Sequence, residues 1–198
     1  MPPARKERAD AVRNREAVLA AAARLFTERG DPDRVSMDDI AAAAGVGKGT
    51  LFRRFGDRVG LVKALVEQRT EQLRADVVAG SPPLGPGAPA GERVLALLDA
   101  LLRLKLHTRP LMLALESAGS GSPYLNDTYA LWHTQLASLL AEVRGERDAD
   151  FLAHALLAAV RSDLIEHLTA GGTSPQQIHD GVAALARAVL AAPAPGAA

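Results

Sequence analysis

A capping box followed by a glycine turn constrains the fold of this chain more than any other feature of its sequence. Ser36 and Asp39 have the S-x-x-D spacing that begins a helix, because each side chain can accept a hydrogen bond from a free backbone N–H group. Gly45 suits the left-handed backbone conformation that often ends a helix. The pattern predicts two short helices, at 37–44 and 48–55, joined by a tight turn.

The rest of the chain has apolar residues at helical spacing and no stretch with the alternation of a strand. We therefore expect an all-α protein of about nine helices. The segment AGSPPLGPGAPAG is rich in proline and glycine, which predicts a linker between two helical domains. The expected divisions are a flexible basic arm at 1–13, a helix-turn-helix domain at 14–78, the linker at 79–91, a second helical domain at 92–191 and a disordered tail at 192–198. In the second domain the expected helices span 92–107, 110–117, 122–144, 148–170 and 174–191.

Composition excludes several classes of protein. The chain has no cysteine, which removes disulfides, thiolate catalysis and cysteine-bound zinc. It has neither an apolar run of about 18 residues nor the apolar core of a signal peptide, so we expect a cytoplasmic protein without a membrane span. The net charge is zero, but residues 1–75 hold 15 Lys and Arg against 11 Asp and Glu, and residues 76–198 hold 8 against 12. This asymmetry favours contact between the N-terminal part and a polyanion, although chance would also explain it.

The helix at 48–55 has two different faces on a helical wheel. The apolar arc holds Leu51, Phe52 and Phe55, and the opposite arc holds Gly49, Thr50, Arg53 and Arg54. Glycine inside a helix costs roughly 0.5–1 kcal/mol relative to alanine, but at an outward position it lets a DNA duplex approach the backbone closely. The second helix of a helix-turn-helix enters the major groove of DNA. We therefore predict a DNA-binding face; the alternative is a solvated surface helix whose arginines have no partner.

The predicted DNA contacts combine phosphate-binding and base-contacting groups. Lys48 projects from the first helical turn, the Thr50 hydroxyl can bind a phosphate, and arginines can reach guanine or phosphate. Arg58, at the start of the next helix, is predicted to clamp a phosphate. The complete predicted set is Ser36, Lys48, Gly49, Thr50, Phe52, Arg53, Arg54 and Arg58.

Residues 14–66 resemble the DNA-binding domain of the TetR family of bacterial transcriptional repressors. The resemblance is carried by NREAVLAAAARLFTERG and VSMDDIAAAAGVGKGTLFRRFGDRVGL, above all by Val46, the run Lys48-Gly49-Thr50-Leu51-Phe52, and Phe55. Two positions differ from the common family pattern. Gly47 stands where a serine or a similar cap is usual, and Phe52 where tyrosine is usual.

The resemblance implies a homodimeric repressor that binds a nearly palindromic operator and is released by a small-molecule effector, with no cofactor. It also implies that residues 92–191 bind the effector and form the dimer. The predicted effector contacts are His107, Leu111, Leu115, Glu116, Tyr129, Trp132 and His133. The predicted dimer contacts are Leu152, Leu156, Val160, Leu164, Ile178, Val182, Leu185 and Val189, although a core within one chain predicts the same apolar stripes.

Other functions remain as alternatives. A ligand-dependent activator or a global DNA-binding regulator would keep the same DNA-binding face. A helical enzyme or small-molecule carrier is disfavoured, because the sequence has no nucleophile motif, metal motif or phosphate loop. All five histidines lie in the second half, but none forms an HxxxH pair, so no metal site is predicted.

Overall fold

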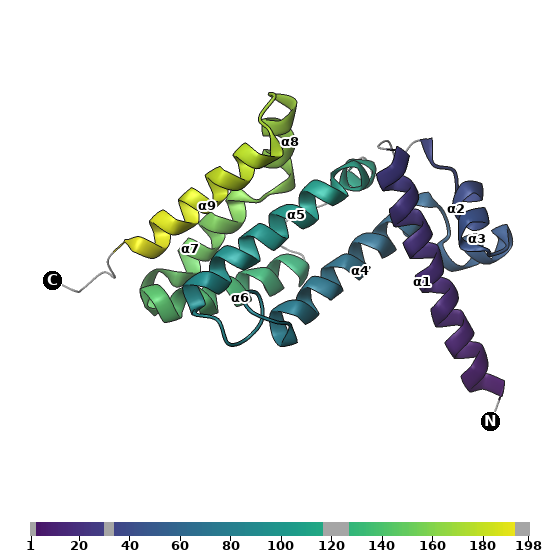
Figure 1. The fold of residues 1–198 in the computed structure, drawn as a ribbon, viewed down its shortest axis with the longest axis horizontal. Coiled ribbons are helices and arrows are strands. Elements are labelled where there is room, and N and C mark those ends of the chain that lie inside the picture. Colours follow the sequence, from purple (N-terminus) through teal and green to yellow (C-terminus); the bar gives the residue numbers. More distant parts are fainter. Residues whose placement is uncertain (1–2, 30–33, 117–126, 193–198) are drawn as a thin grey trace. The chain divides into compact units, whose positions relative to one another are not determined.

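A computed structural model of the chain describes residues 3–29, 34–116 and 127–192, and the side chains of residues 10–29, 34–106 and 127–192. These residues form helices and connecting turns, with no strand among them (Figure 1). The chain divides into two compact units. The first contains residues 1–69 and 110–118, and the second contains residues 70–109 and 119–198. The all-α fold predicted from the sequence is confirmed.

The first unit is built from the helices before residue 70. They are α1 (Pro3–Arg29), α2 (Met37–Ala44), α3 (Lys48–Phe55) and the first half of α4 (Arg58–Ala79). The predicted bounds of α2 and α3 are confirmed. Helix α1 begins at Pro3, so it includes most of the segment 1–13 that is expected to be a flexible arm. Proline is well tolerated in a first helical turn, and the alanine, arginine and glutamate residues that follow are favourable in helices.

The core of the first unit lies where α1, α2, α3 and α4 meet. Each helix contributes apolar side chains that are almost fully buried: Val18, Leu19, Ala22, Leu25, Phe26, Val35, Ile40, Ala41, Leu51, Phe55, Leu61, Val62, Ala64 and Leu65. Burial of such side chains stabilises a fold by about 1.5–3 kcal/mol for each large residue. This core fixes which face of α3 points away from the protein.

The second unit consists of longer helices around a leucine-rich core. They are the end of α4, the part of α5 (Ala90–Glu116) before residue 110, α6 (Asp127–Arg144), α7 (Glu146–Ala159), α8 (Ser162–Ala170) and α9 (Pro175–Ala191). The core residues include Leu97, Leu101, Trp132, Leu136, Leu140, Leu156, Val160, Ile178 and Ala186. Helix α7 packs against both α6 and α9, and α8 packs against α9. The segment 80–89, between α4 and α5, contains turns and no helix.

Two helix boundaries in the second unit differ from the prediction. Helix α5 continues through the expected break before Pro110, because the leucine-rich sequences on both sides favour a helix strongly enough to offset one lost hydrogen bond. The expected helix 148–170 is divided into α7 and α8, because Arg161 has an extended backbone. The Arg161 guanidinium donates to both carboxylate oxygens of Asp163, at 2.9 and 2.6 Å. The pKa of Asp163 is lowered to about 2, chiefly by these hydrogen bonds.

Candidate nucleic-acid interface

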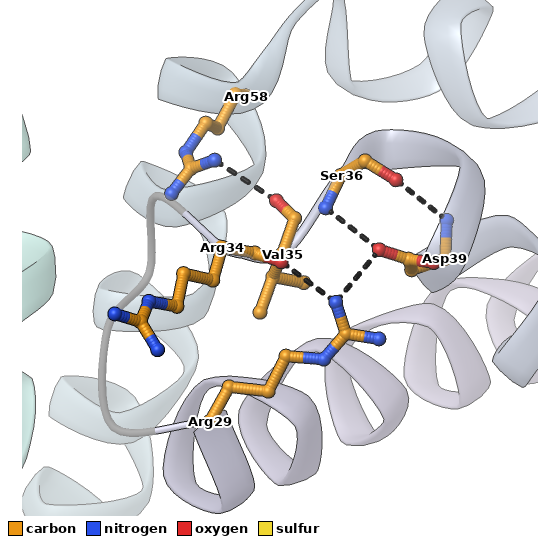
Figure 2. A network of polar contacts seen from close by, with 6 residues as sticks. All are labelled: Arg29, Arg34, Val35, Ser36, Asp39 and Arg58. Atoms are coloured by element: carbon orange, nitrogen blue, oxygen red, sulfur yellow. Dashed lines mark hydrogen bonds and ion pairs between the residues drawn. The ribbon is translucent and has the colours of Figure 1, made fainter.

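The start of α2 is held by the predicted capping box. The Asp39 backbone N–H donates to the Ser36 hydroxyl at 3.1 Å, and the Ser36 backbone N–H donates to the Asp39 carboxylate at 3.0 Å (Figure 2). Hydrogen bonds from the backbone and side chain of Ser36 lower the pKa of Asp39, and Arg29 lowers it further. The box satisfies two of the N–H groups that a helix start leaves unpaired, so the direction of α2 is fixed locally.

Arg29, at the end of α1, extends this network. Its Nη1 atom donates to the Arg34 carbonyl at 2.6 Å and to the Asp39 carboxylate at 3.0 Å (Figure 2). Ten positions separate Arg29 from Asp39 in the chain, so the sequence alone does not predict this contact. The charged pair ties the end of α1 to the start of α2 and so positions the helix-turn-helix on the first helix.

Arg58 has a different role from the predicted phosphate clamp. Its Nη1 atom donates to the Val35 carbonyl at 2.9 Å (Figure 2). Its guanidinium lies 5.8 Å from the centroid of the Phe26 ring. The Arg58 side chain therefore points into the junction of α1, α2 and α4. A guanidinium held by a carbonyl and an aromatic face is a structural element of this junction, and we remove it from the predicted DNA contacts.

The turn between α2 and α3 has the backbone geometry that glycine permits. Gly45 has φ 66° and ψ 29°, in the left-handed region. The Gly45 N–H donates to the Ala42 carbonyl at 3.2 Å, and the Val46 N–H donates to the Ala41 carbonyl at 3.0 Å. This pair of bonds is a Schellman motif, and the Val46 side chain packs against the core. The tight turn sets the angle at which α3 leaves α2.

Helix α3 has one buried and one exposed face. Leu51 and Phe55 are buried in the core of the first unit, as the helical wheel predicts. The helical wheel also predicts Phe52 in the apolar arc, but 38% of its surface is exposed. The Lys48 ammonium lies 5.9 Å from the centroid of the Phe52 ring. Phe52 thus belongs to the exposed side with Lys48.

The cations of α3 differ in their availability. Arg53 is exposed, and no hydrogen bond or ion pair joins it to the part of the chain that the structure describes. Lys48 is exposed too, but its Nζ atom lies 2.8 Å from a carboxylate oxygen of Asp38. The Arg54 guanidinium donates to the Ala11 carbonyl of α1. Of the three, Arg53 is the most accessible to a ligand, whereas Arg54 supports the packing of α3 on α1.

The N-terminal turn of α3 is open to a partner. Gly49 is exposed, and a Cβ atom built on it would meet no other atom within 4 Å. Gly47 occupies the N-cap and provides no side-chain cap. Thr50 is half-buried, and its N–H donates to the Gly47 carbonyl at 2.9 Å. Because no protein atom crowds Gly49, intramolecular packing does not explain the glycine, whereas close approach of another molecule would.

The predicted effector contacts are only partly described. His107, Leu111, Leu115 and Glu116 lie in α5, but their side chains fall outside the described ones. On α6, Trp132 is buried in the core, while Tyr129 and His133 are half-buried. These three residues lie apart from a groove of about 390 Å³ between α5 and α9. The groove is lined by Leu95, Leu98, Asp99, Leu102, Arg103, Gln176, His179, Asp180, Val182, Ala183 and Ala186.

The predicted dimer contacts divide between the core and the surface. Four of them are buried within this one chain, as expected if the apolar stripes form an intramolecular core: Leu156, Val160, Ile178 and Val182. They are therefore unavailable to a second subunit, and we withdraw them as dimer contacts. Leu152 and Val189 are half-buried, and Leu164 and Leu185 are exposed.

The exposed face of α3, held by a capped α2 and a tight turn, defines a helix-turn-helix protein. Comparison with known proteins agrees: residues 18–65 match the family described as bacterial regulatory proteins, tetR family. The chain is 33% identical over 98 residues to the HTH-type transcriptional regulator TtgW of Pseudomonas putida, covering 50% of this chain and 70% of that one. The chain belongs to the TetR family of bacterial regulatory proteins.

Two further comparisons extend the similarity. The HTH-type transcriptional repressor LfrR of Mycolicibacterium smegmatis is 35% identical over 82 residues, which cover 41% of this chain and 42% of LfrR. The crystal structure of the TetR transcriptional regulator SCO0520 from Streptomyces coelicolor superposes with a TM-score of 0.57 at 28% identity, covering 92% of this chain and 99% of that one. Most of the curated relatives are matched over less than half of their own length. None of the described helices is long and apolar enough to cross a membrane.

Proposed function

We propose that the chain is a sequence-specific DNA-binding transcriptional regulator, acting as a homodimeric repressor that a small-molecule ligand releases from its operator. The observation that carries the proposal is the two-faced α3. Leu51 and Phe55 anchor this helix in the core, and Lys48, Gly49 and Arg53 face solvent. A short, rigidly mounted helix with a cationic and partly bare outer face suits insertion into a major groove.

The charges of this face suggest how DNA would be held. Arg53 can form two hydrogen bonds with a guanine edge or bind a phosphate. Lys48 would exchange the Asp38 carboxylate for a phosphate, and because the Lys48–Asp38 pair is exposed, its loss costs little. The bare backbone at Gly49 would let a phosphate or sugar approach the first turn of α3, where helix N–H groups attract anions.

The name of LfrR, a transcriptional repressor, supports the repressor role by similarity. A dimer would present two copies of α3 to half-sites about one helical turn of DNA apart, or roughly 34–36 Å. An effector that prefers a different separation of these helices would weaken operator binding. By linkage, the operator would then weaken effector binding by the same factor.

The groove between α5 and α9 supports the existence of an effector site. Its leucine and alanine walls suit an apolar ligand, and its polar groups could orient one. His179 Nδ1 lies 3.0 Å from an Asp99 carboxylate oxygen at this groove. A ligand with an apolar part and several polar groups fits this lining, which also contains Asp99, Arg103 and Asp180.

The test measures DNA affinity and stability together in the Gly49→Ala variant. Full-length protein would be titrated by fluorescence anisotropy against operator DNA obtained by selection from random sequences. Alanine is favoured over glycine in a helix by up to about 1 kcal/mol, so we expect an unchanged or higher melting temperature. The new methyl group would hold the duplex away, and we expect operator affinity to fall at least about tenfold, equivalent to about 1.4 kcal/mol.

Arg53→Ala tests the same face through charge. If Arg53 contacts a guanine, its loss should cost about 1–3 kcal/mol and relax one operator position. Arg74→Ala is the matched control, because Arg74 lies in the second unit and pairs with Glu71 at 2.7 Å. Unchanged operator binding in both Gly49→Ala and Arg53→Ala, or no sequence preference in the selection, would contradict the proposed function.

A further inference from the structure

Helices α6 and α7 bring together three side chains that the sequence analysis leaves separate. His133 lies on α6, while Asp150 and His154 are one helical turn apart on α7. One potential ligand atom from each residue lies within 4.8 Å of the other two. His133 Nε2 is 3.4 Å from an Asp150 carboxylate oxygen and 3.3 Å from the Asp150 backbone carbonyl oxygen, so a metal ion at this nitrogen would replace the hydrogen bond to that carbonyl. The D-x-x-x-H spacing on α7 is visible in the sequence, but only the packing of α6 on α7 adds the third group.

We propose that His133, Asp150 and His154 form a binding site for a divalent transition-metal ion of the zinc class. Two imidazoles and one carboxylate are a common ligand set for such ions, with water free to complete the coordination. Metal–ligand bonds of about 2.0–2.1 Å in a tetrahedron place neighbouring ligand atoms roughly 3.3 Å apart. The 3.4 Å between His133 and Asp150 already matches that separation.

Tyr129 contacts His154, one of the two proposed imidazole ligands. Its hydroxyl oxygen lies 2.5 Å from His154 Nδ1, and the two rings are stacked with centroids 5.8 Å apart. In the tautomer that suits metal binding, Nδ1–H donates to the Tyr129 oxygen and Nε2 carries the lone pair that would bind the ion. Metal-binding histidines usually donate their second ring N–H to a carboxylate, a backbone carbonyl or water, which fixes the ring orientation, and the Tyr129 hydroxyl would act as the acceptor here.

The arrangement of the two imidazoles shows what binding would change. The His133 and His154 rings are stacked, with centroids 3.9 Å apart and planes inclined by 28°. A shared ion requires the rings to tilt so that their nitrogen lone pairs converge. His133 is held by its surroundings, with 17% of its side chain exposed, whereas Asp150 is 77% exposed and can move freely toward an ion. Binding would therefore draw Asp150 and His154 of α7 toward His133 of α6.

The ligand set also selects the class of ion. Magnesium and calcium prefer oxygen ligands, and this cluster offers one carboxylate against two imidazoles. The zinc class accepts imidazole nitrogen readily. The three residues lie within the second unit, so a test of the metal site does not depend on the outcome of the DNA-binding tests.

The experiment is a calorimetric titration of zinc into full-length protein that carries no polyhistidine tag and has been treated with a chelator. We expect saturation at one zinc ion per chain. His154→Ala and Asp150→Asn should each lower zinc affinity at least about tenfold, the effect typical of losing an important group at a metal site. His179→Ala is the matched control, because His179 also faces a carboxylate, that of Asp99, but lies outside the cluster.

A second readout identifies the coordination directly. Cobalt(II) added to the same protein should give visible absorption bands that zinc abolishes and that Asp150→Asn weakens. Asp150 is highly exposed, so this variant should keep its fold, and circular dichroism checks that it does. The proposal is overturned by absence of saturable zinc binding, by equal loss of affinity in His179→Ala, or by magnesium binding as tightly as zinc.

Discussion

Asp39 makes the stability of the first unit depend on pH. Its pKa is lowered from the usual 3.8, chiefly by the Ser36 backbone N–H and also by the Ser36 hydroxyl and Arg29. A carboxyl group with a lowered pKa in the folded state stabilises the fold above the pKa of the unfolded state. That stabilisation disappears as the pH falls through the folded-state pKa. We therefore expect Asp39→Asn to lower the melting temperature at neutral pH and to have little effect well below pH 3.8.

The control for this prediction is the adjacent carboxylate. Asp38 makes an exposed ion pair with Lys48, and such pairs contribute little to stability. Asp38→Asn should therefore leave the melting temperature nearly unchanged at every pH. Equal losses for Asp38→Asn and Asp39→Asn at neutral pH would show that the capping network adds nothing beyond a surface charge.

At the junction of α3 and α4, the two helices approach each other so closely that position 60 requires a glycine. A Cβ atom on Gly60 would lie 2.0 Å from the Phe55 carbonyl oxygen, so the backbone would have to move. The Gly60 N–H also donates to the Asp57 carboxylate at 2.8 Å. We expect Gly60→Ala to lower the free energy of unfolding by about 1–3 kcal/mol, the usual cost of overpacking, measured by urea denaturation.

Gly49→Ala is the internal comparison for Gly60→Ala, since both substitutions add one methyl group to a helical glycine of the same unit. Gly49 has open space around it, so its substitution should not lower the urea midpoint. If the two variants unfold at the same urea concentration, the close approach of Gly60 to Phe55 is not maintained in solution.

The elements differ in how far the sequence specifies them. The bounds of α2 and α3 could be predicted because caps and turns are local chemistry, contained in Ser36, Asp39 and Gly45. The division between α7 and α8 could not be predicted from the sequence. It depends on the extended backbone of Arg161 and its hydrogen bond to Asp163, and not on a glycine or a proline.

At the candidate site too, the sequence predicts the side-chain roles that depend on local helical geometry and misses those that depend on packing between helices. The wheel places Leu51 in the core correctly, since burial follows helical phase. It does not predict that Arg58 binds the Val35 carbonyl, or that His133 joins two residues of α7, because these contacts depend on how separate helices pack. The exposed cation Arg53 was predictable; the internal engagement of Arg54 and Arg58 was not.

For the whole molecule, the proposed dimer needs a surface that one chain leaves open. On α9 the exposed positions Gly181, Ala184, Leu185 and Ala188 recur at helical spacing and form one apolar face. Small side chains let two helices approach closely, and Leu185, 44% exposed, can anchor the contact. Leu164 on the adjoining α8 is exposed as well. We infer that this exposed face of α8 and α9, rather than the buried apolar residues of α7 and α9, would meet the second subunit.

Leu185→Glu should therefore convert the dimer to a monomer, because two carboxylates would face each other at an apolar interface. Light scattering after gel filtration should give the mass of one chain, 20.8 kDa, for the variant and twice that mass for the native protein. Val143→Glu, on α6 and of similar exposure at 37%, should remain dimeric.

Because two linked binding sites gain affinity on the order of 10²–10⁴-fold over one, the monomeric Leu185→Glu variant should lose most of its affinity for a palindromic operator and keep its weak affinity for a half-site. A variant that stays dimeric would place the interface elsewhere, whereas a monomer with full operator affinity would contradict the paired α3 helices themselves.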